Sequence, residues 1–147
     1  MVRYLVALLP CFHFFCCIMT LLNRLSQQLR IWWLPLSWAV LIFWLSSQST
    51  LPGMQVSIYD FILKKSAHMI AYAILYALTF RSLSLAQPEL KPKDWRVWLL
   101  AFLLCFLYAV SDEVHQAFTP SRTPSPRDVG YDLLGMSVAF LKLYKFI

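Results

Sequence analysis

The sequence SDEVHQAFTPSRTPSPRDVGYDLLG, residues 111–135, separates two strongly apolar segments. It contains four of the chain's seven acidic residues, and histidine, glutamine and arginine side chains lie among them. A charged side chain near bilayer depth costs roughly 2.5–3.5 kcal/mol on insertion scales, and more when it is unpaired. Because the apolar flanks predict membrane helices, so many polar groups between them indicate a function at this point of the fold.

The composition excludes an ordinary soluble domain. Of the 147 residues, 60% are hydrophobic and 14% are charged, and the mean hydropathy is +0.62. Too little polar surface would remain to cover a soluble core. The net charge of +6 does not predict nucleic-acid binding, because the basic residues fall in small groups between apolar runs, as they do in loops beside membrane helices. We therefore expect a protein surrounded by membrane lipid.

The apolar runs predict an all-α fold, a polytopic transmembrane helical bundle. A crossing needs about 20 mostly apolar residues. Four core helices are expected over roughly 31–47, 66–85, 95–118 and 129–146, with an additional N-terminal helix over 2–22. The polar residues 23–30 and three proline-containing segments separate them. We thus divide the chain into an N-terminal apolar helix with a short basic loop, 1–30, and a membrane domain, 31–147.

Two other interpretations of the first segment stay open. It could be a signal peptide, although no small-residue cleavage site follows it. The start could also be placed too early, since Met19 would begin a version with four helices. Either way, more Lys and Arg fall in the loops on the side of the C-terminus, which predicts a cytoplasmic C-terminus.

Three groups of polar residues are predicted to meet at the outer end of this bundle. Their spacings of three, four and seven residues place each group on one helix face. Because lipid does not tolerate such groups, they should face each other or a wet cavity. The candidate ligand-binding residues are Lys65, His68, Tyr72, Asp112, Glu113, Gln116, Arg122, Asp128 and Asp132.

Several chemistries are compatible with these side chains. His68, tuned by Asp112 or Glu113, could carry a proton in acid–base catalysis. A divalent cation could bridge Asp112, Glu113 and Asp128, although no metal-ligand motif of known spacing is present and no cofactor is expected. Alternatively, the polar groups only fix the register of the helices. The sequence leaves open whether the protein is an enzyme.

The motifs are similar to those of the VanZ-like membrane proteins. The resemblance covers about residues 31–147 and rests on FWLSSQ at 43–48, on the spacing of Lys65, His68 and Tyr72, and on the run from Ser111 through Arg122 to Gly135. Two positions depart from the family pattern. Lys64 stands where an acid precedes the Lys, and Asp132 stands where an Asn is usual, which exchanges two donors for a potential charge.

This resemblance implies a small multi-helix protein of the bacterial cytoplasmic membrane. The family takes its name from a member linked to resistance to the glycopeptide antibiotic teicoplanin. It implies a ligand from the cell envelope: a lipid, a cell-wall precursor or a glycopeptide. Two alternatives remain beside this expectation, a membrane-embedded acid–base or metal-assisted enzyme that acts on a lipid-linked substrate, and a structural or assembly subunit.

Overall fold

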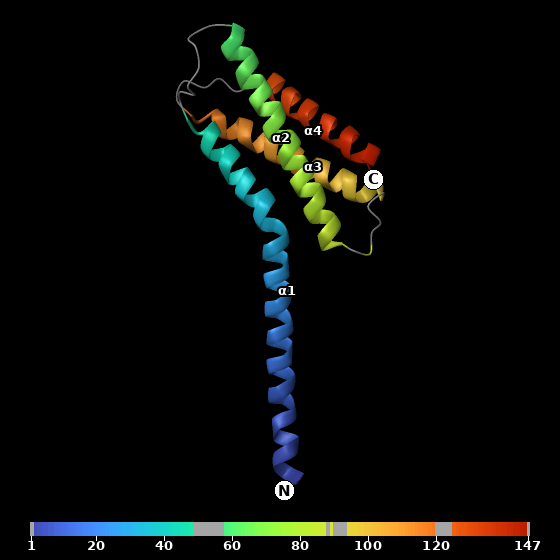
Figure 1. The fold of residues 1–147 in the computed structure, drawn as a ribbon. Helices are drawn as coiled ribbons and strands as arrows, with labels where there is room; N and C mark the ends of the chain where they lie inside the picture. Colours follow the sequence, from blue (N-terminus) through green and yellow to red (C-terminus); the bar gives the residue numbers. More distant parts are fainter. Residues whose placement is uncertain (1, 49–57, 88, 90–93, 120–124, 147) are drawn as a thin grey trace. The chain divides into compact units, whose positions relative to one another are not determined.

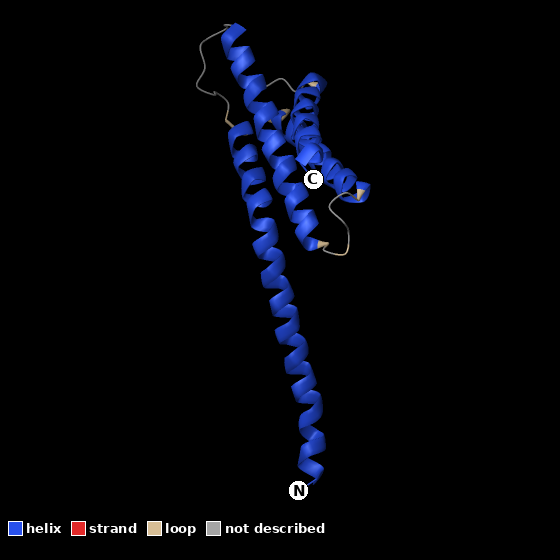
Figure 2. Ribbon diagram, turned by 45° about the vertical axis from the view of Figure 1, so that its right-hand side comes forward, coloured by secondary structure: helices blue, strands red, loops and turns tan. Residues whose placement is uncertain are grey.

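The described part of the chain is helical. The computed structural model describes residues 2–48, 58–87, 89, 94–119 and 125–146, with side chains from residue 17 onward except at 60 and 146. Its helices are α1 (Val2–Ser46), α2 (Ile58–Ala86), α3 (Trp95–Gln116) and α4 (Pro126–Phe146) (Figure 1). Figure 2 shows no strand in these residues. The predicted all-α class is confirmed.

Helix α1 corrects one predicted boundary. The sequence predicted two helices joined by a polar loop over 23–30, but α1 runs without interruption from Val2 to Ser46. Residues 23–30 (NRLSQQLR) contain neither Gly nor Pro, and Leu, Gln and Arg are strong helix formers. Polarity alone does not end a helix, so the predicted loop is wrong.

The chain forms two compact units, Met1–Trp33 and Leu34–Ile147. The division lies next to Pro35, a residue that removes one backbone hydrogen bond inside α1. In the first unit, every described side chain from Cys17 to Arg30 is exposed. The second unit holds the end of α1 together with α2, α3 and α4, and it contains the core.

Along the middle of α3, small side chains are buried and leucines are exposed. On α3, Ala101, Cys105 and Ala109 are buried, whereas Leu103 and Leu107 are exposed. Water would penalise this arrangement, but lipid does not, and small residues let membrane helices approach closely. Three described helices are long and apolar enough to cross a membrane: Cys17–Ser46, Phe61–Ala86 and Trp95–Gln116. The chain is therefore a membrane protein.

Helix α4 packs mainly against α2 and also contacts α3. Helices α2 and α4 approach closely at Gly135, where an added Cβ would lie 2.1 Å from the carbonyl oxygen of Met69. Only a glycine leaves room for this contact. The first turns of α4 are polar, because Arg127, Asp128 and Asp132 lie there. The contact at Gly135 sets these acids opposite the polar face of α2.

Candidate functional site: a polar cluster in the second unit

Eight of the nine predicted site residues lie in the described part of the chain. Hydrogen bonds and charge pairs join seven of them, and the eighth, Glu113, lies within electrostatic reach of His68, Asp128 and Asp132. We call them the polar cluster: Lys65, His68, Tyr72, Asp112, Glu113, Gln116, Asp128 and Asp132. The ninth, Arg122, lies outside the described residues. The predicted convergence of three helices is thus present in the structure.

Two charge pairs connect α2 with α4. Lys65 Nζ donates to Asp128 Oδ1 at 2.5 Å, and His68 Nδ1 lies 3.3 Å from Asp132 Oδ1. Lys65 and His68 are three residues apart on α2, and Asp128 and Asp132 are four residues apart on α4. The two pairs therefore lie about one helical turn from each other. The approach at Gly135, three residues after Asp132, brings both acids within reach of α2. Asp132 is only 1% exposed.

Asp112 joins the cluster to the end of α1. Its Oδ1 accepts a hydrogen bond from Ser46 Oγ at 2.5 Å. Its Oδ2 accepts from Gln116 Nε2 at 3.1 Å and, at a longer 3.5 Å, from Tyr72. Asp112 and Tyr72 are both buried. A single carboxylate therefore connects α1, α2 and α3.

Glu113 is held differently. Its Oε2 accepts from the backbone N–H of Ser125 at 3.0 Å, just before α4 begins. Its Oε1 is buried and has no hydrogen-bond partner among the described residues. The residue as a whole is 7% exposed. A buried carboxylate oxygen is costly unless something pairs with it, so this atom marks a position where a donor is expected.

Five residues that contact or adjoin the cluster were not among the predicted site residues: Phe43, Ser46, Ser47, His115 and Ser125. Ser46 contacts Asp112, and Ser47 Oγ lies 3.0 Å from His115 Nε2. The His115 ring also stacks on Phe43 at 4.2 Å. Ser125 caps α4, because its Oγ accepts from the N–H of Arg127. The position of FWLSSQ at the end of its helix was a usable signal, since that end meets the polar end of α3.

The cluster has an excess of acid. Four carboxyl groups face one permanent cation, Lys65, and one histidine, and Lys65 is already paired with Asp128. Neither Asp112 nor Glu113 contacts a cation within the described residues. The cluster can therefore receive hydrogen-bond donors and positive groups. Because Lys65 is paired with Asp128, it is not free to hold an anionic group of a ligand.

A metal site is not formed by these side chains. Within the described residues, no three His, Cys, Asp or Glu side chains are placed to hold one ion. Both oxygens of Asp112 accept hydrogen bonds, from Ser46, Tyr72 and Gln116, and Asp128 pairs with Lys65. The cation considered between Asp112, Glu113 and Asp128 therefore lacks its ligand set in the described part of the chain.

Comparison with known proteins agrees with the motifs. The family model described as VanZ/LLP1 matches residues 4–147. The chain belongs to the VanZ/LLP1 family. The match also includes the N-terminal segment, which the motifs alone had left outside the resemblance. No curated protein and no solved structure matches the chain.

In this VanZ/LLP1 chain, the two departures from the family pattern lie on neighbouring helices. Lys64 is half-buried on α2, next to the paired Lys65. Asp132 contacts His68, so an acid replaces the usual amide at the histidine itself. A carboxylate there can accept a proton or a hydrogen bond, but unlike an amide it donates only when protonated.

Proposed function

We propose that this VanZ/LLP1 protein binds a molecule of the bacterial cell envelope through the polar cluster, at the outer face of the cytoplasmic membrane. The observation that carries the proposal is Glu113 Oε1, a buried acceptor without a partner among the described residues. If the cluster only held helices together, each buried acceptor should be used between helices, as the two oxygens of Asp112 are by Ser46 and Tyr72.

The chemistry of the cluster favours a ligand that presents amino or hydroxyl groups. Asp112, Glu113 and Asp132 are buried acids, and one histidine is the only cationic group that contacts any of them in the described residues. An amine or a sugar hydroxyl would donate to Glu113 Oε1 and reduce the desolvation cost of that carboxylate. Amino and hydroxyl groups occur on envelope lipids, cell-wall precursors and glycopeptides such as teicoplanin.

The test replaces Glu113 with glutamine. Gln keeps an oxygen that accepts from the Ser125 N–H, but it removes the charge and puts a donor at the open position. In a susceptible host, we expect Glu113→Gln to reach normal membrane abundance and to lose the protection against teicoplanin that the wild type gives. Glu89→Gln, at an exposed site outside the cluster, is the control and should protect fully.

Two results would contradict this proposal. If Glu113→Gln protects as fully as the wild type, the polar cluster is not the binding site. Lost abundance of this variant, with normal abundance of Glu89→Gln, would make Glu113 structural. If the wild type gives no protection, the glycopeptide is excluded as the ligand, and the same two variants are compared for binding of amine-bearing envelope lipids in vesicles.

A second candidate function rests on His68. Asp132 contacts Nδ1, and within the described residues no hydrogen bond reaches Nε2. A carboxylate that orients one imidazole nitrogen and leaves the other free is the arrangement of a general acid or base. An enzyme of this kind would act on a lipid-linked substrate, and His68→Ala should abolish turnover. Identical envelope-lipid profiles by mass spectrometry in cells with wild type, His68→Ala or no protein would exclude it.

A further inference from the structure

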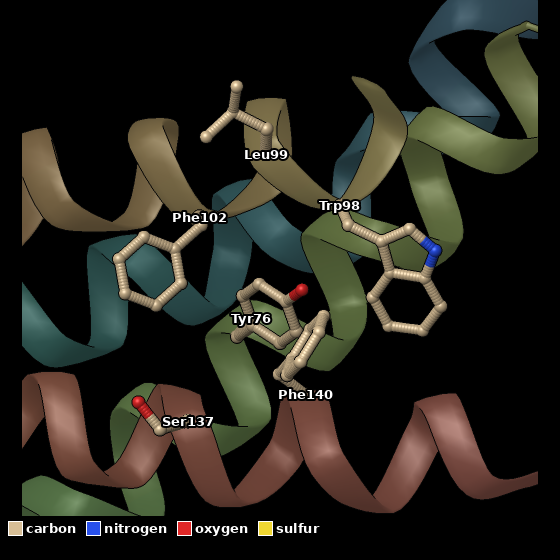
Figure 3. A pocket seen from close by; sticks show the side chains of 6 residues that line it. All are labelled: Tyr76, Trp98, Leu99, Phe102, Ser137 and Phe140. Atoms are coloured by element: carbon tan, nitrogen blue, oxygen red, sulfur yellow. The ribbon is translucent and has the colours of Figure 1, made fainter. Parts of the chain in front are cut away.

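A cavity of about 230 Å³ lies among α2, α3 and α4, away from the polar cluster. Figure 3 shows the side chains that surround it. They are Tyr76, Trp98, Leu99, Phe102, Ser137 and Phe140. Pockets that enclose a drug-sized ligand occupy about 300–1,000 Å³. This cavity would therefore take a segment of a chain rather than a whole molecule.

One polar atom in this apolar lining is unexplained. Tyr76 is fully buried, and its hydroxyl has no hydrogen-bond partner among the described residues. In Figure 3 the Tyr76 ring lies between α3 and α4, beside Phe140. The other hydroxyl, Ser137 Oγ, already donates to the Leu133 carbonyl in its own helix. Because an unpaired hydroxyl in an apolar site is costly, Tyr76 indicates an acceptor supplied by an occupant.

The position of the cavity indicates where that occupant comes from. Trp98 lies three residues after the start of α3, and Phe140 lies six residues before the end of α4. These separations place the two side chains about 5 and 9 Å from the ends of their helices, measured along the helix axes. If the helix ends lie at the membrane surface, this is the depth at which hydrocarbon meets the headgroups. Leu99 is exposed on the apolar outer surface, so the cavity borders the lipid-facing side of the unit.

The same end of the bundle is basic. Exposed Arg81 lies five residues before the end of α2, Arg96 is the second residue of α3, and Lys142 and Lys145 lie within the last five residues of α4. Two described acids, Glu89 and Asp94, lie there as well, and Asp94 is engaged as the N-cap of α3. Arg96 precedes Leu99 by three residues and so lies on the same side of α3. A positive rim beside an apolar cavity is complementary to a lipid with an anionic headgroup.

We propose that this cavity binds one acyl chain of an anionic glycerophospholipid. The chain fills the space among Trp98, Phe102 and Phe140, and the Tyr76 hydroxyl donates to an ester carbonyl oxygen. Arg96 holds the phosphate. This site is separate from the polar cluster, so it does not depend on the function proposed for that cluster.

Native mass spectrometry of the complete chain, purified in a nonionic detergent, tests the proposal. Dioleoyl phosphatidylglycerol and dioleoyl phosphatidylcholine are the probes. We expect phosphatidylglycerol to bind more tightly, and Tyr76→Phe to weaken it by about fivefold, the effect of one hydrogen bond. Tyr131→Phe makes the same change near the opposite end of α4 and should leave binding unchanged.

Two further measurements separate the contacts. An ether-linked phosphatidylglycerol lacks the carbonyl oxygens, so it should bind the wild type about as weakly as the ester lipid binds Tyr76→Phe, and the variant should not distinguish the two lipids. Ser137→Leu fills the cavity and should reduce binding of every lipid probe.

Three outcomes would overturn the proposal. Equal binding of ester lipid by Tyr76→Phe and wild type would mean that a water or no acceptor meets the hydroxyl. Equal binding of phosphatidylglycerol and phosphatidylcholine would remove the role of the basic rim. A dimer that Ser137→Leu dissociates would make the cavity an interface between two copies of the chain.

Discussion

At the scale of single residues, Asp112 determines how the cluster holds together. Its two oxygens receive Ser46 from α1, Tyr72 from α2 and Gln116 from its own helix. These donors are buried, so none can turn to water if the carboxylate is removed. Glu113, the next residue, makes one backbone contact and leaves one oxygen open. The two adjacent acids therefore differ: Asp112 connects helices, and Glu113 keeps the open oxygen on which the proposed ligand binding rests.

Asp112→Ala should therefore destabilise the protein. We expect a loss of about 1–3 kcal/mol, because buried donors lose their acceptor and interhelical hydrogen bonds in membranes average about 0.6 kcal/mol each. Thermal unfolding in detergent micelles measures the change. Ser111→Ala changes an exposed neighbour whose hydroxyl, among the described residues, donates to the Tyr108 carbonyl of its own helix, and it should unfold within about 0.5 kcal/mol of the wild type. Equal unfolding temperatures of the two variants would mean that Asp112 does not connect the helices.

Helix periodicity was sufficient to predict which residues meet, but not how they pair. The i, i+3, i+7 spacing of Lys65, His68 and Tyr72 placed them on one face, and the structure has them there. Which acid each of them would contact depends on how far α4 is shifted along the axis of α2. The contact of Gly135 with Met69 fixes this axial position, and a single sequence does not show which residues of two helices meet in this way.

At the scale of elements, this glycine contact gives the second prediction. An alanine Cβ at 135 would lie 2.1 Å from the Met69 oxygen, so α2 and α4 would have to separate. We expect Gly135→Ala to lower the free energy of unfolding by about 1–3 kcal/mol, as overpacking does. It should also reduce envelope-ligand binding, because the Lys65–Asp128 and His68–Asp132 pairs span the same two helices.

Gly130 is the matched control on the same helix. Apart from the backbone of its own stretch of helix, no described atom lies within 4 Å of the Cβ that an alanine would add there. Gly130→Ala should therefore be neutral or raise stability by about 0.5–1 kcal/mol, the helix propensity difference. If both variants unfold at the same temperature, close packing at residue 135 is not what holds α4 against α2.

Helix ends were harder to predict than helix faces. Pro126 was expected to exclude helix, yet it is the first residue of α4, where its missing N–H costs nothing. Residues 23–30 were expected to form a loop because they are polar, yet they contain no helix breaker. In both cases the local backbone preference decides the structure, and hydropathy alone gives the wrong boundary.

At the scale of the whole molecule, the distribution of charge predicts its direction in the membrane. Basic side chains gather where α2 ends and α3 begins, and again where α4 ends. Acidic side chains gather at the opposite ends of the same helices, in the polar cluster. Because cytoplasmic loops carry excess Lys and Arg, the basic end should face the cytoplasm. The cluster then faces outward, where envelope molecules are accessible.

Reporter fusions in a bacterial host test this direction. A green fluorescent protein fused after Ile147 should be fluorescent, because that protein folds in the cytoplasm, and alkaline phosphatase at the same position should be inactive. Replacing Lys142 and Lys145 with Gln removes the positive charge at the end of α4 alone. Because Arg81 and Arg96 remain, the C-terminus of this variant should still lie in the cytoplasm. An active phosphatase fusion would place the polar cluster in the cytoplasm. An extracellular glycopeptide could not then reach Glu113, and the ligand would have to come from the inner leaflet.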